Sequence, residues 1–206
     1  MANPNSPLGF IPYSYVWGAP YSGSFSVYFI PASNGSNIFI GDPVDVISGS
    51  NDAFGRPAVQ IATSGSPVTG VIVGIVNGGD MGAEVAVTRD LPIFRTASSA
   101  QYVAVADDPN LLHLVQDDAS AQATAPNLWS GKNANFISGS GSTVTGYSGY
   151  QLRALSVATT NTLDLKIFNP IQRPDNQVST VANVNMNAKW LVKFNNSRWA
   201  NQLAGV

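Results

Sequence analysis

Short runs of β-branched and aromatic residues, separated at close intervals by glycine and proline, dominate this sequence. The 206 residues include 19 glycines and 13 prolines. Such frequent breaks are unfavourable for helices and favour many short strands joined by turns. No long stretch shows a convincing helical period. We therefore expect an all-β protein.

The expected strands share a period of two between apolar and other residues, which is typical of a sheet with one solvated face. They cover residues 25–30, 44–47, 59–61, 68–76, 84–88, 102–106, 111–115, 162–168 and 189–194. The residues expected in the core are Phe25, Val27, Phe29, Val103, Val105, Leu163, Leu165, Ile167, and either Leu191 or its neighbours Trp190 and Val192.

Many short strands with regularly spaced turn signals are the pattern of a jelly roll, a related β-sandwich or a barrel. We expect a jelly roll or related sandwich, formed as a single domain by residues 25–206. Residues 1–24 have a different composition and are expected to form an extended N-terminal arm.

The expected arm is rich in proline and aromatic residues. Its aromatic residues Tyr13, Tyr15, Trp17 and Tyr21 lie among four prolines that restrict the backbone to extended geometry. One interpretation is a leader packed on its own domain. The other is that residues 3–23 lie on a neighbouring subunit, because exposed aromatic side chains mark contact surfaces. The sequence leaves both open.

Charged residues make up only 11% of the chain, against about 25% in an average domain. There is one histidine, no cysteine and one glutamate, Glu84. Groups for proton transfer, nucleophilic attack or metal binding are therefore scarce. We expect no enzymatic activity, no cofactor and no metal site.

The few polar candidates have simple structural interpretations. His113 lies between Leu112 and Leu114 and is expected on the polar face of a strand. The pairs Asp107–Asp108 and Asp117–Asp118 lack the spacing of a calcium loop and are expected to form turns.

Charge and hydropathy also limit the expected partners. The net charge is −2, and the basic residues do not form a stripe along the sequence, so we expect no nucleic-acid binding. The apolar stretch 71–76 is far shorter than a membrane span. The first residues lack the pattern of a signal peptide, so we expect no membrane association and no export.

Tryptophans offer one alternative function, a sugar-binding platform. Trp190 alternates with Val192 and Phe194 in an expected strand and is assigned to the core. Trp199 follows the last expected strand and is the better surface candidate. The candidate interface residues are therefore Tyr13, Tyr15, Trp17, Tyr21 and Trp199.

Several separated segments resemble a family of tailed-bacteriophage virion proteins, the capsid cement or decoration proteins encoded beside the major capsid protein. The resembling segments are Gly18–Gly23, Ile40–Val44, Tyr102–Pro109, Gly141–Gly149, Leu163–Ile167, Gln172–Asn176 and Ala188–Asn196. The segment after Asn196, Ser-Arg-Trp, departs from the more polar sequence expected there.

The resemblance implies a protein that binds the outer surface of the capsid shell, bridges adjacent capsid subunits and stabilises the head. The implied partners are the major capsid protein and further copies of the chain, as a homodimer or homotrimer. The implied location is the virion surface after synthesis in the host cytoplasm. The low charge agrees with this, because interface cores are poor in charge and rich in aromatic residues. The alternative is a carbohydrate-binding β-sandwich of a phage tail or spike.

Overall fold

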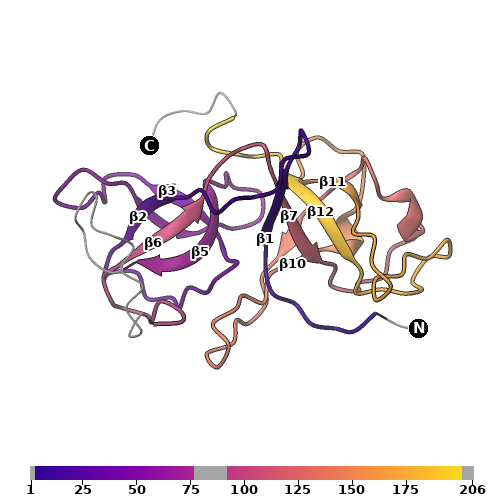
Figure 1. Ribbon diagram of the computed structural model, residues 1–206, viewed down its shortest axis with the longest axis horizontal. Coiled ribbons are helices and arrows are strands. Elements are labelled where there is room, and N and C mark those ends of the chain that lie inside the picture. Colours follow the sequence, from indigo (N-terminus) through magenta and orange to yellow (C-terminus); the bar gives the residue numbers. More distant parts are fainter. Residues whose placement is uncertain (1–2, 77–91, 201–206) are drawn as a thin grey trace.

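Two β-structured units lie side by side in the computed structural model, which describes residues 3–76 and 92–200 (Figure 1). One unit is a closed barrel of five strands, and the other is an open five-stranded sheet. The all-β class expected from the sequence is confirmed. The strand order of the described residues is that of a barrel beside a sheet, so the narrower expectation of a jelly roll is not confirmed.

The barrel closes in the order β2-β4-β3-β5-β6. Strands β2 and β4 are parallel, and the other neighbours are antiparallel. The strands are β2 (Ser26–Ile30), β3 (Pro43–Ile47), β4 (Ala58–Ile61), β5 (Gly70–Val76) and β6 (Gln101–Ala106). Closure leaves no free strand edge in this unit.

The barrel interior is filled by branched apolar side chains. Its buried residues are Tyr28, Ile30, Ile38, Val44, Val46, Val59, Ile72, Ile75, Val103 and Val105. The expectation for Val103 and Val105 is confirmed. The face expected for β2 is wrong: Tyr28 and Ile30 point inward, whereas Phe25 is 38% exposed. Both faces of β2 carry apolar residues, so alternation alone did not fix which face is buried.

The sheet has the order β1-β7-β12-β11-β8 and is antiparallel throughout. Its strands are β1 (Ile11–Tyr15), β7 (Leu111–Gln116), β8 (Asn133–Ala134), β11 (Leu165–Pro170) and β12 (Lys189–Phe194). The short strands β9 (Phe136–Ile137) and β10 (Gln151–Leu152) pair separately, and Pro126–Leu128 and Ala154–Ser156 form single 3₁₀ turns. The described residues contain no helix that could cross a membrane.

One face of the sheet forms the larger core. Leu165, Ile167, Trp190 and Val192 are fully buried there, as expected, while Leu163 is only half-buried. Leu191 points to the opposite face and packs with Leu114 and Ile171. The sequence left open whether Leu191, or Trp190 and Val192, lie in the core. The structure places Trp190 and Val192 in the larger core.

The two units share this core. Ala62, Val68 and Val71 of the barrel unit belong to the same buried cluster as the sheet residues. Polar contacts add to the junction: Ser64 Oγ and Gly65 N donate to the buried carboxylate of Asp164 at 2.6 and 2.8 Å. The barrel and the sheet are therefore packed against each other through a continuous interior.

The first part of the expected arm belongs to the domain instead. Strand β1 pairs with β7 of the same chain, and Phe10 is 1% exposed in the shared core. A backbone hydrogen bond from Phe10 N to Gly41 O, 2.9 Å long, holds the leader against the segment before β3. Gly9 and Gly41 both have positive φ, and a Cβ on either would lie 2.6 Å from a backbone oxygen of the other segment. The boundary expected at residue 24 therefore does not separate an arm from the fold.

The other expected strands are found with shifts of a few residues at their ends. The strand expected at residues 84–88 lies outside the described residues. Strand β1 was missed because its proline and its place within a proline-rich segment argued for an arm.

Candidate functional site

The aromatic residues of the leader lie on a tight β-hairpin. After β1 the chain turns back, with Gly18 N donating to Tyr15 O at 2.9 Å and Tyr15 N donating to Ala19 O at 2.8 Å. Tyr21 N then donates to Tyr13 O at 3.1 Å. Gly18 has a φ of 92°, which a glycine adopts without strain. The hairpin is thus fixed by its own backbone bonds.

The tip of this hairpin presents stacked rings to solvent. Tyr15 and Trp17 stack with ring centroids 4.9 Å apart and an angle of 6° between their planes. Trp17 is nevertheless 64% exposed, and its neighbour Val16 is 41% exposed. A large apolar area is therefore held in one orientation without being covered.

Hydrogen bonds fix the hairpin to the barrel unit and to the turn before β7. The Tyr15 and Tyr21 hydroxyls contact Ser24, at 3.1 Å to its Oγ and 2.8 Å to its carbonyl oxygen. Val16 N donates to Asn110 O at 3.0 Å. Partial burial raises the pKa of Tyr21 above its ordinary value.

Trp199 borders an open cavity of about 460 Å³ near this hairpin. Phe25 lies on the same cavity with Asp107 and Asp108. Tyr28 Oη donates to Asp107 Oδ2 at 2.8 Å, and burial together with this bond raises the pKa of Tyr28. The cavity thus combines exposed aromatic rings with carboxylate oxygens.

An ion pair positions Trp199. The guanidinium of Arg198 makes a bidentate contact with Asp45 of β3, and both side chains are nearly buried. Thr69 Oγ1 donates to the same carboxylate at 3.0 Å. Arg198 N also donates to Val68 O at 2.9 Å. The residue before Trp199 is therefore fixed to the barrel unit both by its side chain and by its backbone.

These parts form one region, here called the aromatic surface. Ser24 is bonded to both hairpin tyrosines and lines the cavity. In Figure 1 the hairpin and the C-terminal segment both rise at the upper edge of the molecule. The aromatic surface comprises Tyr15, Val16, Trp17, Tyr21, Phe25 and Trp199.

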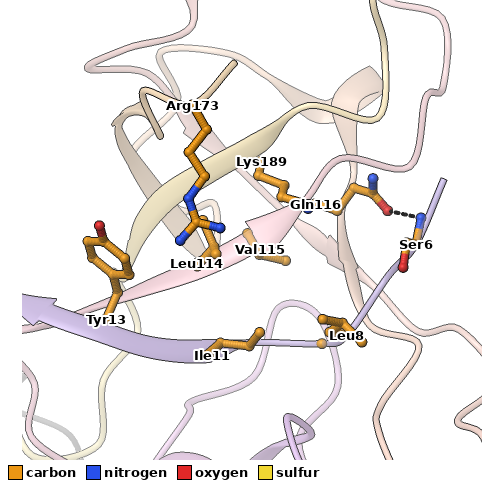
Figure 2. Close-up of a pocket in the computed structure, with 10 residues that line it drawn as sticks. Ser6, Leu8, Ile11, Tyr13, Leu114, Val115, Gln116, Arg173 and Lys189 are labelled. Carbon is orange, nitrogen blue, oxygen red and sulfur yellow. Dashed lines mark hydrogen bonds between the residues drawn. The ribbon is translucent and has the colours of Figure 1, made fainter. Parts of the chain in front are cut away.

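Tyr13 is the one predicted interface residue that the structure places elsewhere. It lines a separate cavity between the leader and β7, with Arg173 on the opposite side (Figure 2). Phe25 is the residue that sequence reasoning missed, because it was assigned to the core. Phe25 lies one residue before β2, outside the positions at which β2 pairs with β6. That position was the only sequence signal that it could be exposed.

His113 is not on a polar face, and the sequence prediction for it is wrong. It is 2% exposed and lies between the rings of Phe10 and Phe194, and within residues 3–76 and 92–200 neither ring nitrogen meets the geometry of a hydrogen bond. Burial lowers its pKa to about 3, so the ring is neutral near pH 7. Strand β7 is buried on both faces, and its residue Leu114, next to His113, packs in a second apolar cluster and not in the larger core.

The acidic pairs differ from each other. Asp108 forms the expected turn, accepting a bond from Asn110 N at 2.7 Å. Asp117 and Asp118 also form the expected turn, accepting bonds from Ala119 N and Ser120 N at 3.0 and 3.1 Å. Asp117 is in addition fully buried and accepts bonds from Ala188 N and from Trp190 Nε1. Among the described residues no three histidine, aspartate or glutamate side chains gather as metal ligands would. No protein-family model, curated protein or solved structure matches this chain.

Proposed function

We propose that this chain is a bacteriophage capsid decoration protein that binds the outer surface of the shell through the aromatic surface. The observation that carries the proposal is the exposed stack of Trp17 on Tyr15 at the tip of an anchored hairpin. The segments that resemble the phage cement family include this hairpin, Gly18–Gly23, and the turn at Asp107–Pro109 beside it.

The energetics suit such a role. Aromatic side chains bury large apolar areas, and tryptophan and tyrosine dominate the residues whose truncation weakens interfaces most. Because Trp17 and Trp199 are already held in place, little conformational entropy is lost on binding. Contacts repeated around a closed shell add further strength, and binding only the assembled state stabilises it.

The proposal includes the bridging of adjacent capsid subunits, a homodimeric or homotrimeric form, and a location on the virion surface. It assigns a binding role without catalysis. The single histidine is buried and neutral, so it is not available as a general base at the aromatic surface.

The test is co-sedimentation with heads of the encoding phage that were assembled without the protein. Trp17→Ala combined with Trp199→Ala is expected to weaken binding about 30-fold or more, the effect of removing 2 kcal/mol at an interface centre. Phe54→Ala is the matched control, since Phe54 is 71% exposed in the loop between β3 and β4. Equal binding by the double variant and the control contradicts the proposal.

A second candidate function is favoured by the cavity at Trp199. Aromatic rings next to paired carboxylates, Asp107 and Asp108, can stack on a sugar ring and accept bonds from its hydroxyls. A glycan array with the purified protein separates the two functions. Binding of a defined glycan that is lost in Asp108→Asn and in Trp199→Ala favours the carbohydrate-binding function.

A further inference from the structure

The outer face of the five-stranded sheet, opposite the core, collects basic side chains that are scattered in the sequence. Strand β12 alternates Lys189, Leu191 and Lys193 on this face, because Trp190 and Val192 occupy the core face. Lys166 of β11 stands on the same face. Three of the four lysines of the chain therefore lie together, although no basic stripe is visible in the sequence.

Two of these lysines face each other directly. Lys166 pairs with Lys193 in the antiparallel register of β11 and β12, so their Cβ atoms are about 5 Å apart. Like charges at such positions destabilise a sheet. Among the described residues, neither makes an ion pair, since the only ion pairs found there are Lys189–Asp175 and Arg198–Asp45. Lys193 Nζ donates to the neutral Asn110 Oδ1 at 3.4 Å, and no carboxylate of the described part of the chain pairs with either lysine.

Apolar side chains lie between the cations. Leu114, Leu191 and Ile171 form a separate buried cluster on this face, with Ile11 and Phe168 packed at its margin. Beside it lies a cavity of about 240 Å³, bordered by Ile11, Leu114 and Tyr13. Figure 2 shows the guanidinium of Arg173 directed toward Leu114 at this cavity, with Lys189 behind it. Basic side chains, Arg173 and Lys189, thus border a cavity that Ile11 and Leu114 also line.

We propose that this outer face is a docking surface for an acidic protein segment. Its carboxylates pair with Lys166, Lys193 and Arg173, and an apolar side chain between the carboxylates enters the cavity bordered by Ile11, Tyr13 and Leu114. The argument is charge complementarity: the chain as a whole is negative, yet this face gathers cations, and the one ion pair found on it among the described residues is Lys189–Asp175.

The spacing favours an extended peptide over a nucleic acid. Side chains at alternate positions on β12 follow the order cation, apolar, cation, with about 7 Å between them. An extended segment with an acid, an apolar residue and an acid at alternate positions repeats that spacing. A phosphate backbone offers charge without the central apolar group. The proposal does not depend on the aromatic surface, which lies on other residues.

The test uses a fluorescent peptide, Glu-Ser-Leu-Ser-Glu, titrated with the purified protein and followed by anisotropy at low salt. The comparison variant carries Lys166→Glu and Lys193→Glu. This double reversal keeps a like-charge pair and so preserves the stability of the sheet. The matched control is Arg153→Glu, an equal change of charge per residue at an exposed position after β10. A peptide with Gln in place of Glu and an oligodeoxynucleotide of equal charge are the ligand controls.

The expected result is saturable binding of the acidic peptide that weakens about tenfold or more in the double reversal and with the Gln peptide. Binding by Arg153→Glu and by Trp17→Ala stays close to that of the wild type. The inference is overturned by a lack of binding, by equal binding to the double reversal, or by equally strong displacement with the oligodeoxynucleotide. The last result assigns the face to polyanions in general.

Discussion

The two halves of the leader, residues 3–12 and 13–24, differ in what their side chains contact. In the first half Asn3 and Phe10 are buried, and the backbone near residue 5 is bonded to Gln116 of β7. In the second half Val16 and Trp17 extend into solvent. The first half stabilises the fold, and the second half presents a rigid surface. The interpretation as a leader packed on its own domain is thus confirmed for the first half, and contact with a neighbouring subunit stays a proposal for the second half.

The difference between the two halves is tested most strongly by the variant Phe10→Ala, for which we expect the largest loss of stability. Phe10 packs against Phe136 and Phe194 in the shared core, so its truncation removes buried area and leaves a cavity. We expect a loss of about 3–5 kcal/mol in the free energy of unfolding, measured by denaturant titration. Phe54→Ala is the control at an exposed site. A loss below about 1 kcal/mol contradicts the anchoring role of the first half.

His113, which packs on Phe10, makes the same region sensitive to acid. Its pKa is about 3 in the folded state against 6.5 as the ordinary value. The unfolded chain therefore binds the proton first, and stability falls as the pH drops from 6.5 toward 3. The slope approaches about 1.4 kcal/mol per pH unit, or about 3 kcal/mol at pH 4.

A second buried group acts in the opposite direction over part of this range. Burial raises the pKa of Asp42 to about 6, so the folded state binds its proton first, and stability from this group is lost as the pH rises from 3.8 through 6. The difference between wild type and His113→Leu isolates the histidine. That difference is expected to grow in favour of the variant below pH 6.5, and a difference independent of pH contradicts the assignment.

A smaller effect is expected at Asn3. Its side-chain amide donates to Gln177 O and Asn185 O, at 2.9 and 2.7 Å, and its Oδ1 accepts from Gln177 N. Asn3→Ala removes these three hydrogen bonds, so a loss of about 1–3 kcal/mol is expected in the free energy of unfolding. Asn5→Ala, at an exposed neighbour, is the control. Equal effects of the two variants show that the first residues are not anchored as described.

The smallest effect on stability is expected at the hairpin tip. Trp17 is mostly exposed, and the stack on Tyr15 is the only aromatic contact that its ring makes with the described part of the chain. Trp17→Ala is expected to change the free energy of unfolding by about 0.5–1.5 kcal/mol, the range for an aromatic pair. Calorimetry checks this value. A loss comparable to that of Phe10→Ala removes the distinction between the two halves.

Much of the fold could be predicted because the strands are short, β-branched and bounded by turns. Strands β3, β5, β7 and β12 lie close to their predicted positions. The pairing of strands could not be predicted, since it depends on contacts far apart in the sequence. The closure of the barrel by the parallel pair β2 and β4 is such a contact.

Errors arose where both faces of a strand are apolar. In β2 and β7 the alternation is present, but the other face also packs against apolar residues, so Phe25 and His113 were assigned to the wrong environment. Period-two patterns show which residues share a face, and they show which face is buried only when the other face is polar.

The candidate site was predicted in part for a similar reason. Trp199 was predicted as a surface residue because it follows the last alternating strand, whereas the sequence left open whether Trp17 is packed on its own domain or exposed. The basic outer face could not be found, because Lys166 and Lys193 become neighbours only through the register of β11 and β12.

The most direct test of the aromatic surface as a binding surface is hydroxyl-radical footprinting of the protein, free and bound to phage heads, read out by mass spectrometry. On heads, oxidation of Trp17 and Trp199 is expected to fall several-fold, while oxidation of the exposed Phe54 stays unchanged. Equal oxidation of Trp17 and Trp199 in the free and the head-bound protein would contradict the account.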